Sequence, residues 1–206
     1  MVDGAHAVGM VGVNLTKIGA DFYGANCHKW LMTPLGCGFL HVRPVLKSLL
    51  KPLITSWGWG NLKRRTGKLG GRLGGGWHFA FEFQGCMDRV PQMVLPEVMA
   101  FRQSLGGESA IANRVRELTR HARERLETIG LTIATPRNPE LCGSMIAIEL
   151  SSANPLQLRE RLWRKHQLET SVTTADGKNF LRISTAWFTT RTEIDQLAAA
   201  LKAIEI

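Results

Sequence analysis

An apolar stripe of helical period in the second half of the sequence constrains the fold most. Its members recur at intervals of three and four residues: Ile111, Val115, Leu118, Ala122, Leu126 and Ile129. That spacing places all of them on one face of a helix. Gly130 follows the last member, in the position where helices commonly end. We therefore predict a long helix over residues 111–129.

Shorter segments of alternating type follow this helix. Their apolar patterns predict strands over residues 131–134, 144–150, 168–173 and 180–184 and helices over residues 154–166 and 192–204. Thr190 and Glu193 have the spacing of a capping box, which supports the start of the last helix. A long helix followed by alternating strands and helices predicts a small α+β domain.

The first third of the sequence has short apolar runs broken by glycine, a pattern typical of buried strands and tight connections. We predict strands over residues 22–25 and 36–42. Residues 58–76 hold eight glycines and five basic residues without apolar periodicity, which predicts a mobile surface loop. We place the boundary between two parts near residues 87–96, so that they span residues 1–90 and 91–206.

The positive charge of the chain is concentrated in one segment. Lys and Arg number 26 against 17 Asp and Glu, a formal net charge of +9. Residues 22–81 contain nine basic residues and no acidic one, which accounts for the whole surplus. A hydrophobic fraction of 44% with 21% charged residues is typical of a globular chain and argues against disorder.

Other features bear on the compartment. No stretch has the apolar length of a membrane span, and residues 1–10 lack the pattern of a signal peptide. The cysteines are scattered without a CxxC pair: Cys27, Cys37, Cys86 and Cys142. They suit free thiols in a reducing compartment better than disulfides or a metal site. We therefore expect a cytoplasmic protein without a membrane partner or a bound metal.

Lys29 is the residue whose surroundings most suggest chemistry. It follows a strand-like run and lies between His28 and Trp30, so we expect its amine to be partly buried. Burial disfavours the charged form of an amine, and the neutral form is a nucleophile that condenses with carbonyls. Asp3 follows an earlier apolar residue and is the kind of group that holds a pyridinium nitrogen protonated. Taken alone, a lysine and a distant aspartate are more often structural.

Several motifs occur together in one order. They are Asp3-Gly4-Ala5-His6, Asn26-Cys27-His28-Lys29-Trp30, Gly-x-Gly-Phe-Leu at 36–40, Ser56-Trp57-Gly58-Trp59, residues 81–88 and Leu181-Arg182-Ile183-Ser184. In this order the sequence resembles the class V aminotransferase family of pyridoxal phosphate enzymes, and within it the isopenicillin N epimerase-like branch. The resemblance omits only residues 61–76. It implies an α/β fold, the C-terminal part of fold type I: the remainder of the cofactor-binding large domain over residues 1–90, then the small α+β domain over residues 91–206.

The resemblance implies roles for five residues around pyridoxal 5'-phosphate. Lys29 would form the internal aldimine and afterwards move the Cα proton of the substrate. Asp3 would pair with the pyridine nitrogen, and His6 would lie near the phenolic oxygen. Asn26 and His28 would bind the phosphate, a dianion that requires donors and positive charge.

Two further residues belong to the same expected site. Arg182 would bind the substrate α-carboxylate through its planar guanidinium group. Cys86 stands where the family commonly has a threonine whose hydroxyl reaches a phosphate across the dimer, and a thiol is a poor donor for that contact. Family members also carry a long preceding segment, so we expect this sequence to correspond to the C-terminal part of the fold.

The resemblance leaves the reaction open. Desulfurase chemistry requires a mobile cysteine before the strand that carries Arg182, and residues 143–206 contain none. Epimerisation requires protons on both faces of the substrate, and only Lys29 is identified, whereas transamination requires Lys29 alone. We favour the epimerase-like assignment because of the motifs. The resemblance implies an amino-acid substrate and a homodimer.

Two other classes remain as alternatives. The chain could be a truncated, non-catalytic remnant, or a half that acts only with a partner chain. A nucleic-acid-binding module is less favoured. Its support is a basic run that could contact phosphates: Lys63, Arg64, Arg65, Lys68 and Arg72. No recognised nucleic-acid-binding motif accompanies the run, and the neighbouring tryptophans flank it rather than interleave with it.

Overall fold

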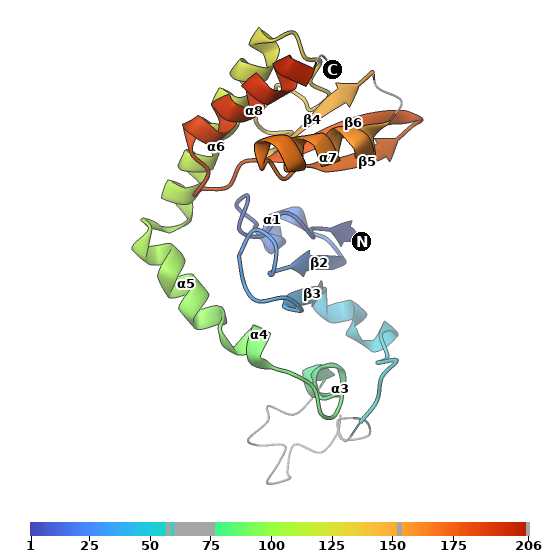
Figure 1. Ribbon diagram of the computed structural model, residues 1–206. Coiled ribbons are helices and arrows are strands. Elements are labelled where there is room, and N and C mark those ends of the chain that lie inside the picture. The colour runs from blue at the N-terminus through green and yellow to red at the C-terminus, as the bar shows by residue number, and fades with distance from the viewer. Residues whose placement is uncertain (57–58, 60–76, 152–153, 205–206) are drawn as a thin grey trace. The chain divides into compact units, whose positions relative to one another are not determined.

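The computed structural model describes residues 1–56, 59, 77–151 and 154–204, which form two units, Met1–Met99 and Ala100–Ile206 (Figure 1). The division falls within α5 (Leu95–Ser104), later than the boundary at residue 90 expected from the sequence. The assignment of residues 1–90 and 91–206 to two family domains stays a prediction. The expected surface loop and its basic run lie outside the described residues. No helix in the described part of the chain is both long and apolar enough to cross a bilayer.

The first unit is built on a small mixed sheet. β1 (Val2–Asp3) pairs in parallel with β2 (Phe22–Asn26), and β2 pairs antiparallel with β3 (Gly38–Val42). The strands predicted at 22–25 and 36–42 are confirmed, the second in shortened form. Alternate residues of β2 are buried, among them Tyr23 at 2% exposure, as expected of a strand with one inward face.

Short helical segments follow or connect the strands of this unit, and α5 continues into the second unit. They are α1 (Leu15–Ile18), a 3-10 helix (Pro44–Leu49), α3 (Trp77–Glu82), α4 (Val90–Met93) and α5. The sequence patterns did not predict them, because most of them are too short to show a helical period. α5 is longer, but its one buried residue is Arg102, so it carries no apolar stripe.

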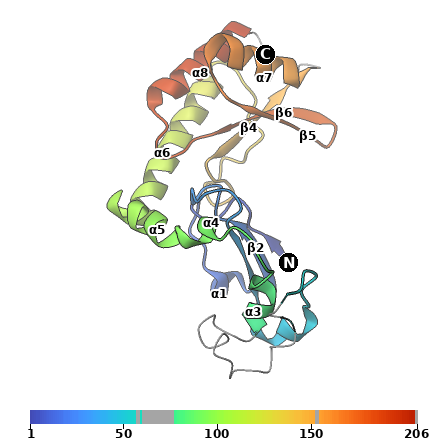
Figure 2. The same ribbon diagram turned by 60° about the horizontal axis from the view of Figure 1, so that its bottom comes forward.

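The second unit packs three helices on an antiparallel sheet. Its strands lie in the order β4 (Met145–Leu150), β6 (Lys178–Ser184), β5 (Ser171–Ala175). α6 (Gly107–Thr128) and α8 (Arg191–Ile204) lie side by side, and α7 (Pro155–His166) completes the layer (Figures 1 and 2). These elements share one buried cluster, which includes Leu118, Leu126, Ile146, Ile148, Leu162, Leu181 and Leu201.

Most predictions for this unit are confirmed. The predicted stripe of α6 is buried from Ile111 to Leu126, and Gly130 follows the helix at φ +85°. In the capping box, the Thr190 N–H donates to Glu193 Oε2 at 2.7 Å and the Glu193 N–H donates to Thr190 Oγ1 at 3.2 Å.

Two strand predictions for this unit were wrong in extent. Residues 131–134 form a single bridge, Ile133 to Ile148, rather than a strand. Pro136 follows closely and has no N–H with which to extend the pairing. The strand expected at 168–173 begins only at Ser171, because Gln167 ends α7 in the left-handed conformation and its neighbours complete that turn.

Candidate functional site

The predicted site residues gather where two parallel strands end. β1 ends at Asp3 and β2 at Asn26, and the turn after β2 carries His28, Lys29 and Trp30. The carboxyl ends of parallel strands meet at one edge of a sheet, the usual place for ligand binding in α/β proteins. The parallel pairing of Asp3 with Gly24 therefore brings the first two motifs to the same edge.

The turn that carries Lys29 is anchored on the start of β3. The N–H groups of Cys27 and His28 both donate to the carbonyl oxygen of Cys37, at 3.0 and 3.3 Å. Cys27, Cys37 and Leu31 form a small buried cluster beneath the turn. Burial and the neighbouring Cys37 thiol raise the pKa of Cys27 to about 11, so this thiol stays protonated at neutral pH. Both cysteines pack as small apolar residues here.

Glycines bring the loop after β1 against this turn. The Gly4 N–H donates to Gly24 O at 2.7 Å, and a Cβ on Gly4 would lie 2.2 Å from the ring of Tyr23. A Cβ on Gly9, which has φ +85°, would lie 2.4 Å from the backbone nitrogen of Leu31. Only glycine permits such close approach in that conformation. The loop that carries His6 is thus held against residues 30 and 31.

Lys29, His6 and Trp30 form one polar contact network. Lys29 Nζ lies 3.2 Å from His6 Nε2, and the indole N–H of Trp30 donates to His6 Nδ1 at 3.3 Å. All three side chains are partly buried. Among the ion pairs formed by the described residues, none includes Lys29. The hydrogen-bonding contact of Lys29 Nζ is thus with a ring nitrogen.

The two residues expected to bind phosphate are held by β3. His28 Nδ1 lies 2.8 Å from the carbonyl oxygen of Cys37, and because a carbonyl only accepts, Nδ1 carries the proton. His28 Nε2 then carries a lone pair when the ring is neutral and a proton that it can donate when the ring is protonated. Asn26 pairs with Gly38, where a Cβ would lie 2.7 Å from Ala25 O, so the strands approach closely at this point.

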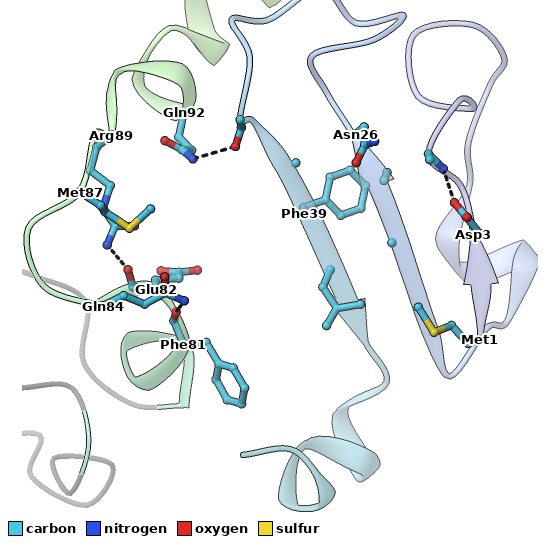
Figure 3. A pocket seen from close by; sticks show the side chains of 16 residues that line it. Met1, Asp3, Asn26, Phe39, Phe81, Glu82, Gln84, Met87, Arg89 and Gln92 are labelled. Atoms are coloured by element: carbon cyan, nitrogen blue, oxygen red, sulfur yellow. Dashed lines mark hydrogen bonds between the residues drawn. The ribbon is translucent and has the colours of Figure 1, made fainter. Parts of the chain in front are cut away.

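A cavity of about 740 Å³ lies over this sheet (Figure 3). Residues of β1, β2 and β3 line one side, among them Asp3, Asn26 and Phe39. The side chains opposite come from α3, α4 and the segment between them: Phe81, Glu82, Gln84, Met87, Arg89 and Gln92. Asp3 Oδ1 accepts the N–H of Ala5 at 2.9 Å. The lining includes Asp3 and Asn26 but not Lys29, His6 or His28.

The remaining predicted residues lie elsewhere. Cys86 follows α3, is exposed, and does not line the cavity. Arg182 lies on the central strand of the second unit and donates to Ser171 Oγ at 3.4 Å. Its Nε is buried and has no hydrogen-bond partner among the described residues. An unpaired buried guanidinium N–H is costly, which makes Arg182 a candidate for an anionic ligand.

Trp30 belongs to this contact network, although no role is predicted for it from its motif. Its indole N–H can only donate, and a donor-only aromatic side chain next to Lys29 is the signal that could have drawn attention to it. Among the residues the structure describes, no group of histidine, cysteine or acidic side chains is arranged to hold a metal.

Comparisons with known proteins place this geometry in context. The family model "Aminotransferase class-V" matches residues 1–197. An isopenicillin N epimerase of Streptomyces clavuligerus is 38% identical over 214 residues, which cover 99% of this chain and 52% of that protein. The chain thus spans about half the length of this curated relative.

Solved structures show the fold. A cysteine desulfurase from Thermococcus onnurineus NA1 matches with a TM-score of 0.78 at 18% identity, over 98% of this chain and 51% of that chain. A C-DES variant with glycine covalently linked to its PLP cofactor matches with a TM-score of 0.74 at 17% identity, over 97% of this chain and 50% of that chain. The predicted α/β fold class, about half of a fold-type I chain, is confirmed.

Proposed function

The chain belongs to the class V aminotransferase family, and we propose that it is a pyridoxal phosphate-dependent protein that acts on an amino acid through Lys29. The observation that carries the proposal is the position of Lys29. Its amine is partly buried at the carboxyl ends of two parallel strands and contacts a histidine nitrogen at 3.2 Å.

The residues at this edge fit the chemical groups of the cofactor. When bound, pyridoxal phosphate supplies an electron sink for the bonds at the substrate Cα. Asp3 offers a carboxylate that lines the cavity and has one oxygen bonded to the Ala5 N–H, and it would hold the proton of a pyridine nitrogen. Asn26 offers an amide donor for a phosphate, and His28 offers one from Nε2 when its ring is protonated. The groups at this edge are thus neutral or basic on the β2 side and acidic at β1.

Lys29 has two tasks in this proposal. Its Nζ would hold the cofactor, and it would accept or return the proton at the substrate Cα. Arg182, with its buried unpaired Nε, is the proposed site for the α-carboxylate of the substrate. His6 orients Lys29 through their contact. Cys86 is exposed, and we assign it no phosphate contact.

We favour epimerase-like over transaminase-like chemistry within this proposal. The support is the 38% identity with an isopenicillin N epimerase. A homodimer is the proposed assembly, as expected for fold type I. The reaction, the substrate and the dimer are proposals for the whole protein, since this chain spans about half of that relative's length.

A partner-dependent half is the second candidate, and exposed apolar side chains in the first unit favour it. They include Phe39 and Leu40 on β3 and Met87, Val90 and Met93 around α4. In this case the cofactor binds only when another chain covers these residues.

The absorption spectrum with added pyridoxal phosphate tests the first proposal. We expect a near-visible band of lysine-bound cofactor in the wild-type chain, and its loss in Lys29→Ala. Lys17→Ala removes an exposed lysine of the same unit and is the matched control, which should keep the band. Borohydride reduction and peptide mapping should place the label on Lys29. Identical spectra for all three chains would contradict the proposal, and a band that appears only with an added partner chain would support the second candidate.

A further inference from the structure

The face of the second unit's sheet that points away from its helices carries Arg182. Successive side chains of a strand point to opposite faces, and Leu181 and Ile183 of β6 are buried in the cluster shared with the helices. Arg182, which lies between them, therefore points to the other face. Its cross-strand neighbours on that face are Ala147 of β4 and Ser171 of β5. This row of the sheet is thus one long cation between two small side chains.

The edge of the Arg182 guanidinium group next to Ser171 is only partly used. Its Nε is buried and has no hydrogen-bond partner among the described residues. Its Nη2 donates to Ser171 Oγ at 3.4 Å, which is long for a hydrogen bond. Nε–H and one hydrogen of Nη2 point in the same direction from the planar group, and together they form an edge that can bind both oxygens of a carboxylate. Ser171 Oγ lies beside this edge.

The charges on this face leave Arg182 available for an anion. Glu149 lies two positions beyond Ala147 on β4 and therefore shares the face. Its carboxylate already pairs with Lys178 Nζ at 2.7 Å. Within the described part of the chain, no carboxylate pairs with Arg182, whose guanidinium group does not lose its charge. An unpaired buried guanidinium N–H is costly, and a carboxylate satisfies it with a strong, charge-assisted hydrogen bond.

The Ser171 hydroxyl offers a further donor at the same edge. In the free chain it can only accept from Arg182, because a guanidinium group has no acceptor. A carboxylate oxygen bound at Arg182 Nη2 would lie close to Ser171 Oγ, since these two atoms are 3.4 Å apart. The hydroxyl can then turn its hydrogen to that oxygen. Ala147, on the other side of Arg182, has no polar side-chain group that would compete.

We propose that Ser171 is a binding residue for a carboxylate: its hydroxyl donates to one oxygen of a carboxylate that Arg182 holds through Nε and Nη2. The inference rests on the proposed function only in that this carboxylate would be the one of the amino-acid substrate. Ser171 and Arg182 together select a carboxylate over a neutral amide. An amide has one oxygen for these donors, and its N–H groups would oppose the rest.

Titration with acetate, followed by the NMR signal of the Arg182 Nε–H, tests the site without cofactor. We expect acetate to shift this signal to saturation, and acetamide, a neutral analogue of the same shape, to leave it unchanged. No shift with acetate, or the same shift with both compounds, would overturn the proposal. Neither Lys29 nor pyridoxal phosphate takes part, so this test can fail while the absorption test of Lys29→Ala succeeds, and the reverse.

Variants on β5 test the role of the hydroxyl itself. Ser171→Ala should raise the dissociation constant for acetate about fivefold, the worth of one hydrogen bond. Ser171→Thr keeps a hydroxyl and should bind acetate nearly as well as the wild type. Thr173→Val removes a hydroxyl from the same face of β5, two positions away, and should leave the constant unchanged.

The position of Ser171 makes these variants suitable. β5 is an edge strand of the sheet, so we expect each variant to keep the circular dichroism spectrum of the wild type. Equal dissociation constants for Ser171→Ala and the wild type would overturn the role of Ser171. A loss of affinity in Thr173→Val or in Ser171→Thr as large as that in Ser171→Ala would also overturn it, because the effect would then not depend on this hydroxyl.

Discussion

The sheet of the second unit packs one face against three helices, whereas the sheet of the first unit leaves apolar side chains of β3 exposed. Ile146, Ile148 and Leu181 are 0% exposed in the second unit, while Phe39 and Leu40 in the first are 40% and 52% exposed. The second unit therefore derives its order from apolar burial. The first is ordered by close backbone approaches and polar contacts, and it carries Lys29, His6 and Asp3.

This difference separates stability from the site. A substitution in the buried cluster of the second unit should lower the free energy of unfolding strongly and change the Lys29 network little. A substitution in the His6 loop should affect unfolding less and the Lys29 network more, because the loop adds only the partly buried Val8 to the small cluster beneath the turn. Substitutions in each unit, with a matched control for each, can break or sharpen this contrast.

The largest change in the free energy of unfolding is expected for the buried cluster of the second unit. Leu118→Ala should lower the free energy of unfolding by about 3 kcal/mol, because Leu118 is fully buried between helices and sheet. Leu40→Ala on the exposed strand β3 should lower it by about 1 kcal/mol or less. Urea unfolding followed by circular dichroism measures both. Equal costs would show that β3 is covered in solution and that the contrast between the units is false.

A smaller loss of stability with a larger effect on the site is expected for Gly9→Ala. The new Cβ would lie 2.4 Å from the Leu31 nitrogen at a positive φ, so the loop must move, at a cost of about 2 kcal/mol. His6 moves with the loop, so its contact with Lys29 Nζ should be lost, and the rate at which trinitrobenzenesulfonate modifies Lys29 should change. Gly12→Ala is the control, since a Cβ there meets nothing within 4 Å. Normal Lys29 reactivity in Gly9→Ala would show that this glycine does not hold the network together.

The same contrast explains how much of the fold the sequence predicts. The second unit follows from periodicity, because α6, α7, α8, β4 and β6 each bury a regular face. The two strand predictions that were wrong in extent fall where local backbone geometry departs from the apolar pattern. They are the single bridge of Ile133 and the segment after Gln167. Apolar periodicity in a sequence indicates which face of an element is buried, and buried apolar faces hold the second unit together.

In the first unit the sequence predicts residue types better than their contacts. Asp3, Asn26 and Lys29 could be named because motifs mark them. The contact of Lys29 with His6 spans 23 positions and depends on the parallel pairing of a two-residue strand, which no periodicity reveals. Gly4 and Gly9 were the available sequence signals for a close approach.

The last prediction concerns the thiols of the first unit, two of which lie in the small buried cluster beneath the Lys29 turn. It requires no substitution. Cys27 and Cys37 are 3% and 1% exposed, whereas Cys86 is exposed. A rise in the pKa of Cys27 from 9.0 to about 11 leaves about 100-fold less thiolate at neutral pH. A thiol reagent should therefore modify Cys86 first, and Cys27 only after unfolding or at high pH.

The raised pKa of Cys27 also makes the free energy of unfolding depend on pH, in one direction. The folded chain keeps the Cys27 proton that the unfolded chain releases from pH 9.0 upward, so the free energy of unfolding should fall as the pH rises toward 11. Urea unfolding across this range measures the change in free energy. Peptide mapping of labelled cysteines reports the ionisation of Cys27, with the exposed Cys86 as the internal control. Rapid labelling of Cys27 at pH 7 would show that the cluster beneath Lys29 opens freely. The first unit would then lack even this small closed core, and the Lys29 network would need another source of order.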